Sequence, residues 1–187
     1  LLADYAGIHS EALYYVPLDK AYEVWCLTLT NTDRKPRSLT VTGYAEFTNN
    51  SNYEQDQVNL QYSLFISRTM FRGNRIRQAI HGNLDALKDG EYVDNKDVTE
   101  RFFGLAGSPV SSYCGDKEAF LGLYHGYGNP VGVETGNLGN VLSYNENSCG
   151  GLSTKIVLQP GERKTVAFIL GMKRDAEAQA ILDGYIN

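Results

Sequence analysis

The sequence YEVWCLTLTNTDRKPRSLTVTGYAEF, residues Tyr22–Phe47, contains two runs in which apolar and polar residues alternate. Alternate residues of a strand point to opposite faces, so residues 22–30 and 38–47 are both predicted strands. The polar residues 31–36 between them end in Pro36, which cannot sit inside a central strand. Two such runs around a short polar turn predict a β-hairpin.

The alternation also predicts which side chains share a face. In the first run, Trp25, Leu27 and Leu29 lie on one face, and Val24, Cys26 and Thr28 on the other. In the second run, the apolar face holds Leu39, Val41, Ala45 and Phe47, and the polar face holds Thr40, Thr42, Tyr44 and Glu46.

Strand patterns recur along most of the remaining chain. Residues 48–57 and 108–147 are expected to be loops, the second with short elements such as a helical turn over 116–122. A helix is predicted over Asp175–Tyr185, with Asp175 as its N-cap. Further strands are expected at 11–18, 58–68, 76–80, 99–105, 155–158 and 165–170, the last two flanking the turn at 159–162. A mainly antiparallel, all-β sandwich with a short C-terminal helix is therefore expected.

Composition narrows the possible partners and compartment. The 187 residues carry a net charge of −5, which predicts no binding to nucleic acid or to an anionic membrane surface. No apolar run approaches the length of about 20 residues that a membrane span requires. Three cysteines, an odd number and without CxxC spacing, favour free thiols in a reducing cytoplasm. The abrupt start without Met or a basic leader suggests an excised piece of a longer protein.

No catalytic, metal or cofactor site is evident from residue spacing. Cys114 and Cys149, with His125 as a base, are conceivable nucleophiles, but buried inert thiols are the better interpretation. The carboxylate pairs Glu54/Asp56 and Asp116/Glu118 are expected to be solvated loop residues rather than a glycosidase pair. Four acidic residues are too scattered for a calcium loop: Asp85, Asp89, Asp94 and Asp97.

Four segments in order resemble the amino-terminal domain of glycoside hydrolase family 94, which comprises the cellobiose, cellodextrin and chitobiose phosphorylases. Together they span most of the chain, and each alone is a weak signal. They are Glu11–Phe47, Asn50–Thr69 (NSNYEQDQVNLQYSLFISRT), Tyr113–Gly136 (YCGDKEAFLGLYHGYGNPVGVETG) and Asn147–Gly171 (NSCGGLSTKIVLQPGERKTVAFILG).

The resemblance implies a galactose-mutarotase-like β-supersandwich over residues 1–172. Residues 173–187 would then begin a helical linker to a barrel that lies outside this chain. Family members are cytoplasmic homodimers that cleave a β-1,4-linked glucan with inorganic phosphate and release α-glucose 1-phosphate. Their general acid lies in the barrel, so the resemblance implies that this chain has no catalytic residue of its own and no cofactor beyond the phosphate co-substrate.

The resemblance also implies a binding role for one polar segment. In the tract Asn59-Leu60-Gln61, the family pattern has a glutamine that approaches sugar bound to the partner subunit. An amide both donates and accepts hydrogen bonds, as a sugar hydroxyl requires. Gln61 is therefore the first candidate, although it could equally cover a strand face. Asn52, Tyr53 and Gln55 are further candidates.

Two other functions remain open from the sequence. The chain could be a free-standing carbohydrate-binding β-sandwich. It could also be a structural module of immunoglobulin type, but this type usually has a Cys–Trp–Cys core and an export signal. Here Trp25 directly adjoins Cys26 and a basic leader is missing, so this function ranks last.

Overall fold

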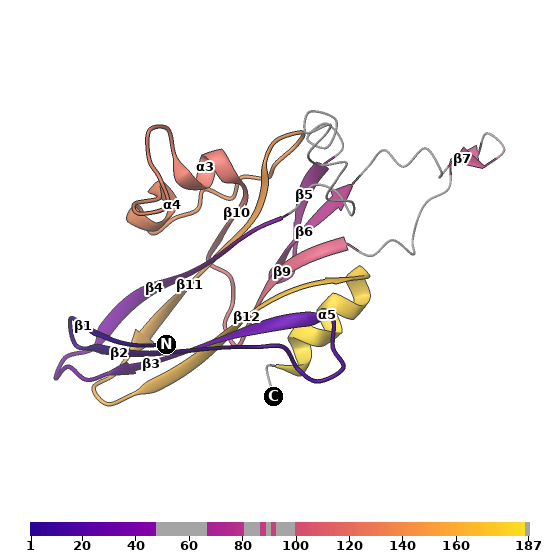
Figure 1. Ribbon diagram of the computed structural model, residues 1–187. Coiled ribbons are helices and arrows are strands. Elements are labelled where there is room, and N and C mark those ends of the chain that lie inside the picture. The colour runs from indigo at the N-terminus through magenta and orange to yellow at the C-terminus, as the bar shows by residue number, and fades with distance from the viewer. Residues whose placement is uncertain (48–66, 81–86, 89–90, 93–99, 186–187) are drawn as a thin grey trace.

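A computed structural model describes residues 1–47, 67–80, 87–88, 91–92 and 100–185 (Figure 1). In this part of the chain, a seven-stranded and a three-stranded sheet stack into a sandwich, and all strand pairs are antiparallel. A further two-stranded pair consists of β7 (Leu87–Lys88) and β8 (Glu91–Tyr92). None of the helices in the described ranges is long and apolar enough to cross a membrane. The expected all-β class is confirmed.

The large sheet has the strand order β1-β2-β3-β12-β9-β6-β5. Its strands are β1 (Leu2–Tyr5), β2 (Ile8–Tyr15), β3 (Tyr22–Asn31), β12 (Arg163–Lys173), β9 (Glu100–Ala106), β6 (Arg75–Ile80) and β5 (Ser67–Arg72). The small sheet has the order β10-β11-β4, with β10 (Ser112–Asp116), β11 (Ser148–Leu158) and β4 (Arg37–Glu46). Two short helices, α3 (Lys117–Leu121) and α4 (Val131–Glu134), follow β10.

The main core lies between the two sheets and follows the predicted alternation. From β3 it receives Trp25, Leu27 and Leu29, and from β4 and the residue after it Leu39, Val41, Ala45 and Phe47. Phe103 lies between the Trp25 and Phe168 rings, with centroid distances of 5.1 and 5.5 Å. The sheets approach closely at Gly43, where an added Cβ would lie 2.5 Å from the Phe168 ring.

The opposite face of the large sheet is covered by helix α5 (Asp175–Gly184). Ala178 and Leu182 of this helix pack on Val24, Phe102 and Ile169 of the sheet. The helix was expected, but the prediction of Asp175 as its N-cap is wrong. Arg174 is the cap residue, and its backbone N–H donates to Glu177 Oε2 at 3.3 Å. The carboxylate of Asp175 is instead held by arginines of the sheet.

The predicted hairpin between 22–30 and 38–47 is wrong, although both strands form. β3 pairs with β2 and β12, whereas β4 pairs with β11 in the other sheet. Residues 31–36 therefore cross from one sheet to the other. Buried Asn31 fixes this crossing, since its Nδ2 donates to Lys35 O (2.8 Å) and to Leu158 O (3.0 Å), and its backbone N–H donates to Glu162 O (3.0 Å).

Most other predicted strands are present with shifted ends. The prediction at 11–18 corresponds to β2, and those at 76–80, 99–105, 155–158 and 165–170 to β6, β9, β11 and β12. The predicted strand 58–68 lies almost entirely outside the described residues. Strand β1 was not predicted. It forms a tight hairpin with β2 because Ala6 (φ 48°) and Gly7 (φ 78°) both adopt the left-handed conformation that such a turn requires.

The two long sides of the sandwich differ. On the β5 side, residues 141–145 join the sheets, with Thr69 N–H donating to Ser143 O (2.9 Å) and Gly115 N–H donating to Val141 O (2.8 Å). On the other side, β4 is the edge of the small sheet, and the large sheet continues past it through β3, β2 and β1. The described part of the sandwich is therefore closed along one side and open along the other.

Candidate functional site

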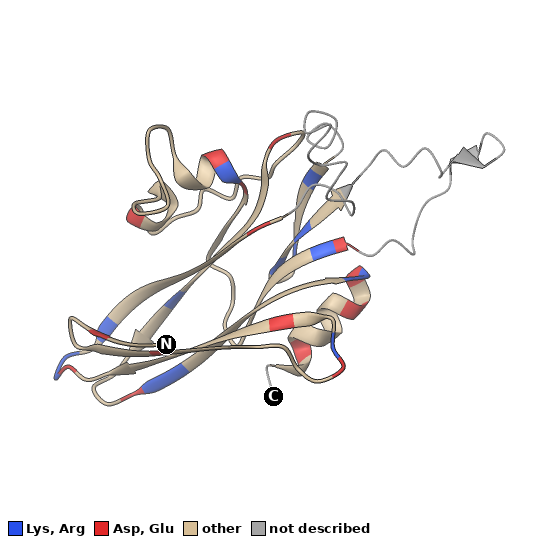
Figure 2. Cartoon of the chain, viewed as in Figure 1, with Lys and Arg blue, Asp and Glu red and all other residues tan. Residues whose placement is uncertain are grey.

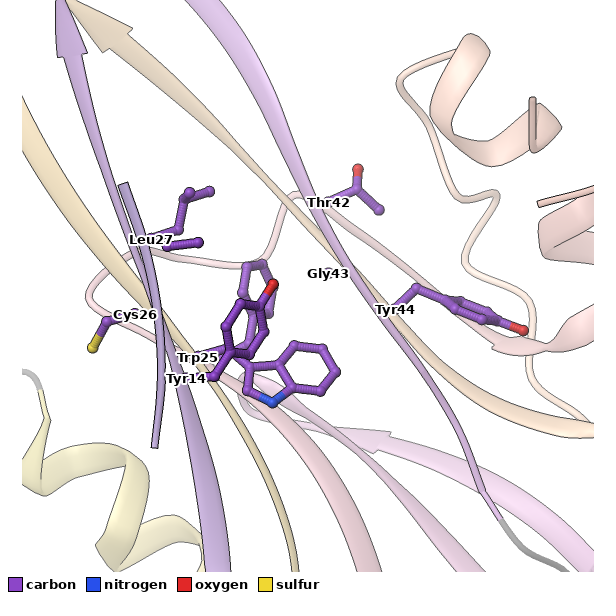
Figure 3. A pocket seen from close by; sticks show the side chains of 9 residues that line it. Tyr14, Trp25, Cys26, Leu27, Thr42, Gly43 and Tyr44 are labelled. Atoms are coloured by element: carbon purple, nitrogen blue, oxygen red, sulfur yellow. The ribbon is translucent and has the colours of Figure 1, made fainter. Parts of the chain in front are cut away.

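A cavity of about 240 Å³ lies at the open side, between the large sheet and the edge strand β4 (Figure 3). Figure 3 shows Tyr14 and Trp25 side by side on the large sheet, facing Thr42 and Gly43 of β4. The ring centroids of Tyr14 and Trp25 are 5.8 Å apart. The full lining comprises Ala12, Tyr14, Trp25, Cys26, Leu27, Thr42, Gly43, Tyr44 and Phe168.

The lining of this cavity is mainly apolar and aromatic. Trp25 contributes the only ring N–H of the lining, and this group already donates to Glu23 Oε1 at 2.6 Å. No carboxylate, lysine, arginine or histidine lines the cavity. The cavity is therefore suited to bind apolar or aromatic groups.

A polar cluster surrounds Glu46, the last residue of β4 before residues 48–66, where the sugar-contact candidates lie. Its carboxylate accepts hydrogen bonds from Tyr44 OH (3.0 Å), Lys117 Nζ (3.2 Å) and Tyr127 OH. Partial burial tends to raise the pKa of Glu46, but the three donors outweigh it and the pKa is lowered. Glu46 is thus a fixed anion at neutral pH.

This cluster was not predicted from the sequence, because Glu46 and Tyr127 are 81 positions apart. The only local signal is the concentration of aromatic and glycine residues in the segment LYHGYG, residues 123–128. Tyr127 is largely exposed, and Lys117 lies over its ring at 5.5 Å. The cluster presents an aromatic ring next to an anion and a cation, a combination that can bind sugar hydroxyls.

A second charged cluster holds α5 against the sheet. Arg75, only 2% exposed, donates from Nε to Asp175 Oδ1 at 3.0 Å and from Nη1 to Gln179 Oε1. Arg72 (3.2 Å) and Arg77 (3.2 Å) also lie against the Asp175 carboxylate. Figure 2 shows acidic residues along α5 and basic residues on strands β5, β6 and β9 of the large sheet. Each of these charged side chains has an ion-pair partner among the described residues, which indicates a structural role.

Cys114 and Cys149 are both fully buried free thiols, and the hydrogen bond between them lowers the pKa of Cys114. Cys149 Sγ contacts the carbonyl oxygen of Cys114 at 3.5 Å, and Cys114 Sγ contacts that of Asp116 at 3.1 Å. The hydrogen bond with Cys114, together with burial, raises the pKa of the Cys149 thiol. A thiol that stays protonated is a poor nucleophile. The interpretation as buried thiols is confirmed.

The other groups considered for catalysis have structural partners where they are described. Asp116 caps α3 by accepting from Ala119 N–H (2.8 Å), and Glu118 accepts from Asn147 Nδ2 (2.8 Å). His125 Nδ1 lies 2.9 Å from Asn129 O. No group of three or more His, Cys, Asp or Glu among the described residues could hold a metal ion.

The predicted sugar-contact residues cannot be located relative to these clusters. Gln61, Asn52, Tyr53 and Gln55 all lie outside the described residues, as do Glu54, Asp56 and the four scattered aspartates. Their roles remain predictions. The described residues place only the end of β4, and with it Glu46, directly before that segment.

The chain is similar in sequence to several curated phosphorylases. The chain is 33% identical over 170 residues to an N,N'-diacetylchitobiose phosphorylase of Vibrio proteolyticus, which covers 90% of this chain and 20% of that protein. A phosphorylase of the same name from Vibrio furnissii is 32% identical with the same coverage. A 3-O-beta-D-glucopyranosyl-beta-D-glucuronide phosphorylase of Paenibacillus borealis is 27% identical, over 95% of this chain and 22% of its own length.

This chain therefore spans about one fifth of the length of the curated relatives that it matches. The profile of the supersandwich domain of glycosyl hydrolase 94 matches residues 2–187, almost the whole chain. The two stacked antiparallel sheets agree with that description. The chain belongs to the glycosyl hydrolase 94 supersandwich domain family.

Proposed function

We propose that this chain is the non-catalytic supersandwich domain of an inverting phosphorylase. The enzyme would cleave a β-linked disaccharide or oligosaccharide with inorganic phosphate and release an α-sugar 1-phosphate. Cellobiose and cellodextrins are the proposed substrates, with N,N'-diacetylchitobiose as the alternative suggested by the names of two relatives. The proposed enzyme is a cytoplasmic homodimer that needs no cofactor besides phosphate.

The observation that carries this proposal is the family match over residues 2–187. A second observation supports the non-catalytic part of it. Among the described residues, the candidate acids accept hydrogen bonds within the fold, the candidate nucleophiles are buried, and no carboxylate, lysine, arginine or histidine lines the cavity. Phosphorolysis requires a general acid at the glycosidic oxygen. In the proposal this acid belongs to a helical barrel for which residues 173–187 begin the linker.

A phosphorolysis assay tests the proposal. A full-length polypeptide that contains this chain is expected to release sugar 1-phosphate from one member of a panel of cellobiose, cellotriose and N,N'-diacetylchitobiose, only when phosphate is present. Residues 1–187 alone are expected to release none. Turnover by the 187-residue chain would contradict the non-catalytic assignment. Glycan binding by this chain, without phosphorolysis by any longer polypeptide, would favour a free-standing carbohydrate-binding module instead.

We further propose that the segment after β4 contributes Gln61 to the sugar site of the partner subunit, with Asn52, Tyr53 and Gln55 nearby. In the full-length homodimer, Gln61→Ala is expected to raise KM for the sugar about fivefold while kcat changes little. This is the effect of losing one hydrogen bond of about 1 kcal/mol that is present in both ground and transition states. Steady-state kinetics at saturating phosphate provides the measurement.

Gln159→Ala is the matched control, because Gln159 is an exposed glutamine at the turn between β11 and β12. It should leave KM unchanged. A mixed dimer tests whether Gln61 acts across the interface. One subunit carries Gln61→Ala and a catalytically dead barrel, and the other subunit is unchanged. The working site should show the raised KM if Gln61 acts on the partner subunit, and the normal KM if Gln61 acts within its own subunit. Unchanged KM in the Gln61→Ala homodimer would remove the proposed sugar contact.

A further inference from the structure

The polar cluster around Glu46 keeps an acceptor position that a ligand can use. A carboxylate has about four acceptor positions, and the described donors Tyr44, Tyr127 and Lys117 use three of them. Oε1 accepts from both tyrosines, so the remaining position is on Oε2, which lies 3.2 Å from Lys117 Nζ. The side chain of Glu46 is 41% exposed, and this position can therefore be reached from solvent.

Lys117 supplies a donor directly beside this acceptor. An ammonium group has three N–H donors, and the described partners of Lys117 are Glu46 Oε2 and Tyr127. Hydrogen bonds with Tyr127 and Glu46 raise the pKa of Lys117 in spite of its partial burial, so the cation persists at neutral pH. One anion and one cation cancel, and the pair therefore favours a neutral ligand that both donates and accepts.

The ring of Tyr127 adds an apolar surface that is held in place before any ligand binds. The residue is 62% exposed, and its ring stands edge-on to that of Tyr44 with a centroid distance of 6.4 Å. Residues 122–130, the loop that carries it, are ordered by internal hydrogen bonds such as that from Asn129 N–H to Gly126 O at 3.1 Å. A group fixed in this way loses little freedom when a ligand binds.

These groups together match a pyranose ring with equatorial hydroxyls. Of two adjacent hydroxyls, one can donate to a carboxylate oxygen while the other accepts from an ammonium group. The C–H groups of such a ring form an apolar face that can pack on an aromatic side chain. β-Linked glucose units carry all their ring substituents in equatorial positions, so this face is available on both sides of the ring.

We propose that Glu46, Lys117 and Tyr127 form a binding site for one glucose unit of a β-linked oligosaccharide. Glu46 Oε2 and Lys117 Nζ bind two adjacent hydroxyls, and the Tyr127 ring packs on the C–H face of the sugar. The inference deepens the proposed function, because it assigns a sugar contact to residues of the described fold. It rests on the carbohydrate ligand proposed there and is independent of the role of Gln61.

Cellotetraose at millimolar concentration is the probe, and amide nitrogen–proton correlation spectra of residues 1–187 are the measurement. The amide signals of Glu46, Lys117 and Tyr127 are expected to shift saturably. Tyr127→Ala should weaken binding about tenfold, because the packing surface is lost. Glu46→Gln should weaken it about fivefold, because a charge-assisted hydrogen bond is replaced by a neutral one.

Two further variants control for general effects. Tyr5→Ala is the matched control, since Tyr5 is 84% exposed but lies on β1 of the large sheet, and it should bind like the parent chain. Tyr127→Phe keeps the ring and loses only the hydroxyl that donates to Glu46, so it should weaken binding only about threefold. Cooperative thermal unfolding of each variant shows that its fold persists. If Tyr127→Ala does not fold, Tyr127→Phe and Glu46→Gln carry the test.

Calorimetry without phosphate repeats the comparison in a full-length polypeptide that contains residues 1–187. There, Tyr127→Ala should again bind cellotetraose more weakly than Tyr5→Ala. Equal affinities of these two variants, or no response of the three amide signals to cellotetraose, would overturn the inference. Release of sugar 1-phosphate by the full-length polypeptide would leave the proposed function standing in that case, so the two failures are distinguishable.

Discussion

Asp175→Ala is expected to lower the free energy of unfolding by about 3–5 kcal/mol, since it leaves the buried guanidinium of Arg75 without its anion. Arg75 is 2% exposed and donates two hydrogen bonds to this carboxylate. The cost of an unpaired buried charge exceeds that of a lost surface ion pair. Urea denaturation followed by circular dichroism measures the difference.

The matched control is Arg72→Ala, which removes a partner of the same carboxylate that is 73% exposed. It should cost less than about 1 kcal/mol. The double variant Arg75→Met/Asp175→Ala should recover much of the loss, because the unpaired guanidinium of Arg75 is then also removed. Equal destabilisation by Asp175→Ala and Arg72→Ala would show that burial of Arg75 does not determine the cost.

The same carboxylate makes stability depend on pH in a defined direction. Burial tends to raise the pKa of Asp175, but the hydrogen bonds from Arg75 and the charges of Arg77, Arg75 and Arg72 outweigh it and lower the pKa below its ordinary value of 3.8. A depressed folded-state pKa adds stability above the unfolded-state pKa. This contribution should be present above about pH 4 and lost as the pH falls further. Asp175→Ala should lack this part of the acid transition.

Phe103→Ala is expected to destabilise the sandwich by about 3–5 kcal/mol, because it opens a cavity where the two sheets meet. The ring is fully buried between Trp25 and Phe168, and its Cβ packs against Gly150 of the small sheet. Since Trp25 loses its neighbour, its emission should also change in the folded state. Chemical denaturation and the spectrum of the native variant provide the two readouts.

Val157→Ala is the control for this prediction. Val157 lies on β11 but is 53% exposed, so its truncation should change stability by no more than about 0.5 kcal/mol. If Phe103→Ala also lowers the free energy of unfolding by only about 0.5 kcal/mol, the aromatic stack does not hold the two sheets together.

The sequence predicted the strands better than it predicted the binding surfaces. Trp25 and Tyr14 were expected as strand residues. The cavity that they share forms only because β4 pairs with β11 in the other sheet. Glu46 and Tyr127 meet although they are 81 positions apart. The candidate sugar contact Gln61 came from family resemblance and not from spacing. Contacts of this kind arise from tertiary packing between distant segments, which no local sequence pattern encodes.

The amino-acid sequence by itself determined the class of the fold, the inward faces of β3 and β4 and the presence of the last helix. These features depend on side-chain alternation and helical periodicity, which are set by the covalent geometry of neighbouring residues. Only the tertiary structure decided that β3 and β4 belong to different sheets. An alternating run can pair with any strand of matching length, and the choice between a hairpin and a crossing is made by distant contacts such as those of Asn31 with Leu158 and Glu162.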